Sequence, residues 1–61
     1  MVEGKRRTIL LVEDEAVIAM AEKMQLERGG YGVVLAYSAA DGVAAASNTG
    51  IDLVLMDIDL G

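Results

Sequence analysis

The chain has 61 residues, a formal net charge of −5 at neutral pH, and neither cysteine nor histidine. These features exclude a disulfide framework, thiolate or imidazole metal sites and a histidine general base, and they argue against a nucleic-acid surface. The apolar runs are far shorter than the ~20 residues of a membrane-spanning helix, and residues 1–7 contain no apolar signal segment. We therefore expect a cytoplasmic protein without membrane association, whose chemistry uses carboxylates, hydroxyls or backbone groups.

The first predicted element is a strand over residues 8–12, which is apolar without alternation. A strand that is buried on both faces of a parallel sheet has this pattern. It ends at three consecutive acids, Glu13, Asp14 and Glu15. Asp14 is expected to be the N-cap of the following helix, with Glu15 adding favourable charge in its first turn.

The second element is a helix over residues 16–28. Its helical wheel places an apolar stripe on one side, and Glu22 lies away from this stripe. We expect the stripe to pack in the core, whereas Leu26 fits it poorly. The stripe consists of Val17, Met20, Ala21 and Met24. Glycines at 29, 30 and 32 then end the helix, because glycine adopts the left-handed conformation without a Cβ clash.

The second half of the chain predicts a strand over residues 33–36, a short helix over about 39–47 and a strand over 51–56. Ser38 begins a capping-box pattern for the short helix. Gly42 should weaken this helix by about 1 kcal/mol relative to alanine. The last strand starts near Asp52, expected to be a solvated turn residue, and ends at Asp57.

The order of elements, βαβαβ, predicts an α/β fold with a parallel sheet and right-handed crossovers. In such sheets the ligand crevice lies at the carboxyl ends of the strands. If the first and third strands are neighbours, Glu13, Asp14 and Asp57 converge at this edge. Two unit charges 4 Å apart cost roughly 4 kcal/mol at an effective dielectric near 20, so converging carboxylates either raise one another's pKa values or recruit a cation. Mg²⁺ suits such a site, because it binds one or two carboxylates and leaves positions for phosphate oxygens.

Each acid also has a structural interpretation. Asp14 alone is as consistent with a helix cap as with a ligand, and Glu13 is consistent with a solvated loop. Asp59 is as consistent with a turn as with a site. Asp57 is harder to explain structurally, because it ends an apolar strand. A dinucleotide-binding site is disfavoured, since the glycines precede the second strand and do not follow the first.

Four motifs occur in order along the chain, and together they resemble the receiver domain of bacterial two-component response regulators. They are the strand ending in acids at residues 8–15, the Gly-Tyr-Gly-Val at 30–33, the alanine-rich segment at 39–45, and residues 51–61. The resemblance implies that Asp57 is the phospho-acceptor. It also implies that Glu13 and Asp14 hold Mg²⁺ directly or through water, with the Asp59 backbone carbonyl as a further ligand.

The resemblance covers residues 8–61, after an N-terminal segment of residues 1–7, and corresponds to the N-terminal half of that flavodoxin-like domain, with strand order 2-1-3. The family's Ser/Thr after the fourth strand and lysine after the fifth have no counterpart here. The complete domain would catalyse its own phosphorylation and dephosphorylation; no independent enzyme activity is expected of this segment.

Two functions remain open. In the first, the chain accepts a phosphoryl group from a histidine kinase or phosphotransfer protein onto Asp57 with Mg²⁺. In the alternative, it is an inactive half-domain that acts only as a structural or interaction module. In that case it would self-associate through the exposed edge of its third strand, Leu53 to Met56, because unprotected apolar edges pair readily.

Overall fold

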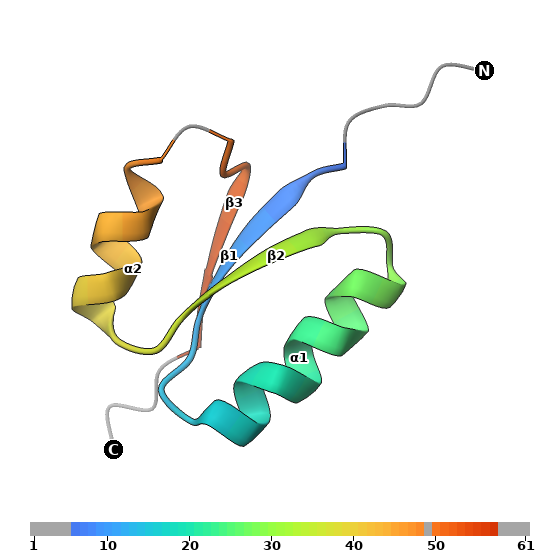
Figure 1. The fold of residues 1–61 in the computed structure, drawn as a ribbon, viewed down its shortest axis with the longest axis horizontal. Helices are drawn as coiled ribbons and strands as arrows, with labels where there is room; N and C mark the ends of the chain where they lie inside the picture. Colours follow the sequence, from blue (N-terminus) through green and yellow to red (C-terminus); the bar gives the residue numbers. More distant parts are fainter. Residues whose placement is uncertain (1–5, 49, 58–61) are drawn as a thin grey trace.

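The computed structural model describes residues 6–48 and 50–57. It contains five elements in the order β1 (Thr8–Val12), α1 (Ala16–Arg28), β2 (Gly32–Ala36), α2 (Ala39–Ala46) and β3 (Leu53–Met56) (Figure 1). The strands form one sheet in the order β2-β1-β3, and both pairs are parallel. The predicted α/β fold, βαβαβ order and 2-1-3 strand arrangement are therefore confirmed.

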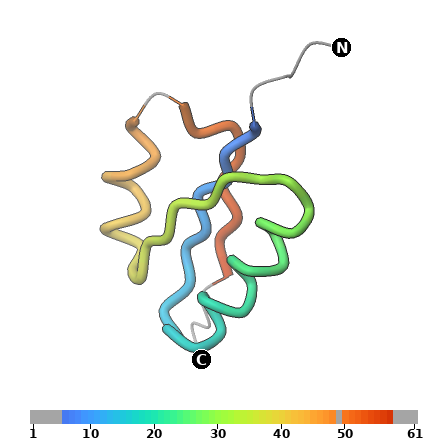
Figure 2. Tube along the Cα trace, turned by 45° about the vertical axis from the view of Figure 1, so that its right-hand side comes forward, coloured from blue at the N-terminus to red at the C-terminus, as the bar shows by residue number. Residues whose placement is uncertain are grey.

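β1 occupies the centre of the sheet, between the two helices. α1 and α2 cover opposite faces, and they remain on either side of the strands in the turned view (Figure 2). Leu10, Leu11 and Val12 are fully buried, which confirms the prediction of a strand covered on both faces. Leu10 and Val12 cluster with Ala36 of β2, with Ala45 of α2 packed against them. Side chains alternate along a strand, so Ile9 and Leu11 point to the opposite face, which α1 covers.

The glycine of α2 is buried against the sheet. A Cβ atom built on Gly42 would lie 2.8 Å from Cγ2 of Val12. The residue that weakens α2 as an isolated helix therefore allows α2 to approach β1. At the start of α2, Ser38 Oγ accepts a hydrogen bond from the Asp41 N–H at 3.1 Å, which confirms the predicted cap.

The predicted apolar face of α1 is wrong, although its bounds are correct. Val17 is 84% exposed, and Met20 and Met24 are about half exposed. The less exposed residues instead recur at intervals of three, four and seven along the helix. They are Ala19, which is buried, and the partly buried Glu22, Lys23 and Leu26. Apolar residues occur nearly all round this helix, so their periodicity alone did not determine which side packs on the sheet.

The predicted N-cap of α1 is also wrong. The N-cap is Glu15, whose side chain makes no capping hydrogen bond. The Glu15 N–H instead donates to Glu13 Oε2 at 2.9 Å. Glu13 is buried and therefore does not lie on a solvated loop, and it also stabilises the helix start, while Asp14 is exposed. At the other end, Gly30 has a φ of 95°, as expected for a glycine that ends a helix.

β3 is an edge strand whose four residues are all exposed. The start of β3 is attached to β1, because the Asp52 N–H donates to the Thr8 carbonyl and the Thr8 N–H donates to Asp52 Oδ2, both at 2.8 Å. Asp52 is exposed as predicted, but it also connects the two strands. None of the helices in the described part of the chain is long and apolar enough to cross a membrane.

Candidate functional site

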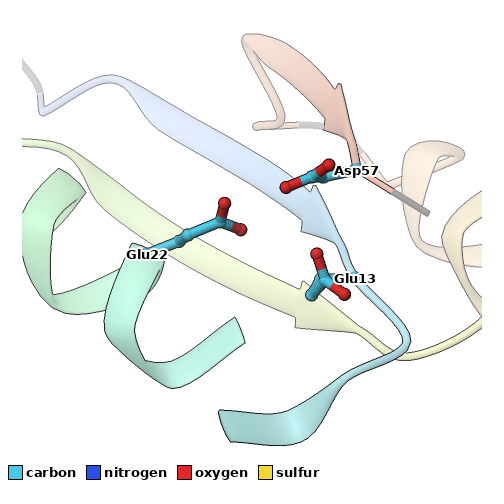
Figure 3. Close-up of side chains that lie close together, drawn as sticks. All are labelled: Glu13, Glu22 and Asp57. Atoms are coloured by element: carbon cyan, nitrogen blue, oxygen red, sulfur yellow. The ribbon is translucent and has the colours of Figure 1, made fainter. Parts of the chain in front are cut away.

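Three carboxylates converge at the carboxyl ends of the central and edge strands. Glu13, Glu22 and Asp57 each offer one oxygen, and these oxygens all lie within 4.8 Å of one another (Figure 3). Glu13 directly follows β1, Asp57 directly follows β3, and Glu22 extends from the middle of α1 towards both. Three separate elements therefore build the site.

The sheet register explains why Glu13 and Asp57 meet. Val12 pairs with Met56, so the next residue of each strand is also a neighbour across the parallel pair. The Asp57 N–H donates to the Val12 carbonyl at 2.8 Å, and the Glu13 N–H donates to the Ala36 carbonyl at 2.9 Å. Residues in register point to the same face of a sheet. Both side chains consequently lie on the face that α1 covers, within reach of Glu22.

Glu13 is the most buried acid of the cluster, with a relative exposure of 3%. The hydrogen bond from the Glu15 N–H lowers the pKa of Glu13, because it favours the charged form. Burial, the neighbouring Asp14 carboxylate and the charge of Asp57 act in the opposite direction and together raise the pKa above its ordinary value. A cation at this position would reverse the effect of the neighbouring charges.

Glu22 has a partly buried side chain with an oxygen that lacks a partner. Its Oε1 atom is buried and makes no hydrogen bond within the described part of the chain. The pKa of Glu22 is raised, first because neutral Glu22 can donate a hydrogen bond to Asp57, then through burial and the charges of Asp57 and Glu13. When both carboxylates are ionised, neither has a proton to donate in such a hydrogen bond.

The donor set fits a hard divalent cation. The ion pair found within residues 6–48 and 50–57 joins Lys23 to Glu27 at 3.0 Å, and neither residue belongs to the cluster. The repulsion among the three acids is therefore not offset by a neighbouring lysine or arginine in this region. Carboxylate oxygens are the ligands that Mg²⁺ and Ca²⁺ prefer, and a bound ion would give Glu22 Oε1 the partner it lacks. The geometry indicates an acidic metal site without identifying the ion.

The structure brings together two of the acids singled out in the sequence. Glu13 and Asp57 lie side by side, whereas Asp14 is exposed beside Glu13, outside the group of three. Asp59 lies outside the described residues. The roles of these four residues as ligands or acceptor stay predictions. Sequence reasoning missed Glu22, because the helical wheel turned it away from the expected core. Its spacing of three and four residues from Ala19 and Leu26 is the pattern that could have revealed it.

The chain is similar to the uncharacterized transcriptional regulatory protein YkoG of Bacillus subtilis (strain 168), with 42% identity over 52 residues. The alignment covers 85% of this chain but 23% of YkoG, so the chain spans less than a quarter of the length of this relative. No family model matches the chain, and no solved structure matches it with significance. The similarity therefore relates the chain to one part of a regulatory protein.

Proposed function

We propose that this chain is the N-terminal half of a receiver domain of two-component signalling, and that Asp57 accepts a phosphoryl group. The donor would be a histidine kinase or phosphotransfer protein in the cytoplasm. The observation that carries the proposal is the meeting of Asp57 with Glu13 at the carboxyl ends of neighbouring parallel strands. The order of the four sequence motifs and the similarity to a protein described as a transcriptional regulator support it.

In this function Asp57 is the nucleophile. One of its carboxylate oxygens bonds to phosphorus as the bond between phosphorus and the donor nitrogen breaks, and the electron pair stays on the donor. Asp57 is exposed, so a donor can reach it, and its backbone is held by the hydrogen bond to Val12. The product is an acyl phosphate on Asp57.

Glu13 and Asp57 would hold Mg²⁺, with Asp14 contributing directly or through water and the backbone carbonyl of Asp59 as a further ligand. When bound, this ion offsets the charge of the crowded carboxylate and phosphoryl oxygens. Glu13 is well placed for this role, because the Glu15 N–H fixes one of its oxygens. The three acids without a cation would instead repel an incoming phosphoryl group.

The test is phosphoryl uptake from acetyl phosphate with Mg²⁺ by the complete receiver domain that contains this segment, followed by intact mass. The wild-type domain should gain one phosphoryl group, Asp57→Asn should gain none, and Asp41→Asn should behave as wild type. Asp41 is a suitable control, because it is an exposed aspartate on α2 whose capping contact uses its backbone N–H. Uptake that persists in Asp57→Asn, or a folded complete domain that takes up nothing, would contradict the proposal.

A second candidate function is self-association through β3. The four residues of β3 are apolar and exposed, and within residues 6–48 and 50–57 no strand pairs with the outer edge of β3. The chain contains no proline that would block pairing at such an edge. We expect a dimer or larger species in light scattering. A folded chain that stays monomeric as its concentration rises would exclude this function; the two functions are otherwise compatible.

A further inference from the structure

The three acids of the cluster differ in how firmly they are held. Glu13 is buried, and the Glu15 N–H holds one of its oxygens. Asp57 has a short side chain, and its backbone is hydrogen-bonded to Val12. Glu22 has a longer side chain on a helix, is only partly buried, and its buried oxygen has no hydrogen bond from the residues that the structure describes. Glu22 is therefore the member of the cluster that can leave it most easily.

The number of acids in the cluster exceeds what a magnesium site that accepts phosphate needs. Mg²⁺ typically binds proteins through one or two carboxylates and reserves its other positions for water and phosphate oxygens. Here three carboxylate oxygens lie within 4.8 Å of one another. A phosphoryl group on Asp57 would bring additional negative charge next to Glu22, which faces Asp57 (Figure 3). The repulsion acts most strongly on the side chain that is least anchored.

We infer that Glu22 is a displaceable third ligand of the cation. While Asp57 is unphosphorylated, Glu22 binds the cation together with Glu13 and Asp57. When Asp57 carries a phosphoryl group, a phosphoryl oxygen takes the place of Glu22. This inference rests on the proposed function and adds a change of ligands at that site. Glu22 binds through its buried oxygen in the first state and turns towards solvent in the second. Its partial exposure gives the carboxylate a short path out.

The test is a calorimetric titration with Mg²⁺ of the 61-residue chain and three variants. Glu22→Gln should weaken Mg²⁺ binding about tenfold, within the range for losing a supporting group of a metal site. Glu22→Asp should weaken it similarly, because its carboxylate is one methylene shorter and does not reach the cluster. Glu27→Gln should not change the affinity, because Glu27 pairs with Lys23 elsewhere on the same helix. Circular dichroism of each variant checks that it is folded.

The titration is then repeated with beryllium fluoride, a phosphoryl mimic that binds to a carboxylate. The affinity difference between wild type and Glu22→Gln should disappear, because Glu22 is already displaced. Unchanged Mg²⁺ affinity in Glu22→Gln would show that Glu22 is not a ligand. Full affinity in Glu22→Asp would show that the carboxylate acts on the cation through its charge at a distance and does not coordinate it. A difference that persists with the mimic overturns displacement.

The same variants separate this inference from the proposed function. In the complete domain, Glu22→Gln should retain phosphoryl uptake from acetyl phosphate at saturating Mg²⁺, whereas Asp57→Asn abolishes it. If the complete domain neither takes up a phosphoryl group nor responds to the mimic, the proposed function fails and displacement fails with it. The Mg²⁺ titration still decides in that case whether Glu22 is a ligand.

Discussion

β1 and β3 are adjacent apolar strands with similar sequences and opposite environments. Leu10, Leu11 and Val12 of β1 are fully buried, whereas the residues of β3 are 41–56% exposed. The difference arises from coverage, because the helices pack on opposite faces of the region formed by β1 and β2 and leave β3 at the edge. An apolar run therefore predicts that a strand can be buried, but its burial depends on which elements lie over it.

The two strands also contribute differently to the protein. Burial of apolar area stabilises a fold by about 25 cal/mol per Å², so β1 carries most of the stability of the sheet. β3 contributes less to the core, but it places Asp57 beside Glu13. The candidate site lies where the stable strand and the exposed strand end together.

The largest expected effect compares two leucines that pair in register, Leu11 of β1 and Leu55 of β3. Leu11→Ala should lower the free energy of unfolding by about 2–5 kcal/mol, because Leu11 is fully buried. A core of this size rarely supplies more than about 3–5 kcal/mol, so this variant should be largely unfolded. Leu55→Ala should cost about 1 kcal/mol or less, since Leu55 is 41% exposed. Urea unfolding at one protein concentration measures both, and equal losses would refute the comparison.

The next effect tests how closely α2 packs on β1. Helix propensity alone predicts that Gly42→Ala stabilises α2 by about 1 kcal/mol. The 2.8 Å approach of the added Cβ to Val12 predicts the opposite sign, with a net loss of about 1–3 kcal/mol from overpacking. Thermal unfolding gives the sign. A more stable Gly42→Ala would show that α2 can move away from β1 without cost.

Lysine substitutions on the two edge strands of the sheet test whether the chain self-associates through β3. Val34 of β2 and Val54 of β3 both pair with Leu10, and their exposures are 40% and 43%. Val54→Lys should weaken self-association roughly tenfold or more. A tenfold change in affinity corresponds to about 1.4 kcal/mol, and burying an unpaired ammonium group in the interface costs more than this. Val34→Lys is the matched control and should leave association unchanged. Sedimentation of both variants measures the effect; equal weakening would place the interface elsewhere.

The smallest expected effect is a pH dependence of the free energy of unfolding, which arises from the acids at the ends of β1 and β3. The pKa values of Glu13 and Glu22 are raised, so the folded state holds their protons more tightly than the unfolded chain does. Their contribution to stability is therefore complete below the ordinary pKa of about 4.3 and is lost as the pH rises through the raised values. Without divalent cations, the free energy of unfolding should fall from about pH 4 towards neutrality.

Glu22→Gln should flatten this dependence, since the amide does not titrate, and Glu27→Gln should leave it as in wild type. Unfolding curves in buffers with a chelator provide the measurement, and adding Mg²⁺ at neutral pH should restore part of the lost stability. Stability that rises with pH over this range would show that the three acids do not repel one another as the geometry implies.

Much of this fold could be predicted from local patterns. The bounds of α1 and the cap at Ser38 follow from apolar runs and turn residues. The strand order came from the family resemblance, and the meeting of Glu13 with Asp57 follows from it by the rules of parallel sheets. These rules act over short stretches or constrain the order of whole elements. The sequence therefore predicts two acids at one edge of the sheet, provided that the first and third strands are neighbours.

The rotation of α1 about its axis was decided only by tertiary packing. Because apolar residues occur nearly all round this helix, the sequence permits several faces to pack, and contact with β1 and β2 selects the face of Ala19, Glu22 and Leu26. That choice brings Glu22 to the site. The same contacts turn Gly42 from a weak helix residue into the place where α2 meets Val12. Periodicity describes one element at a time, whereas these features depend on the distance and angle between elements.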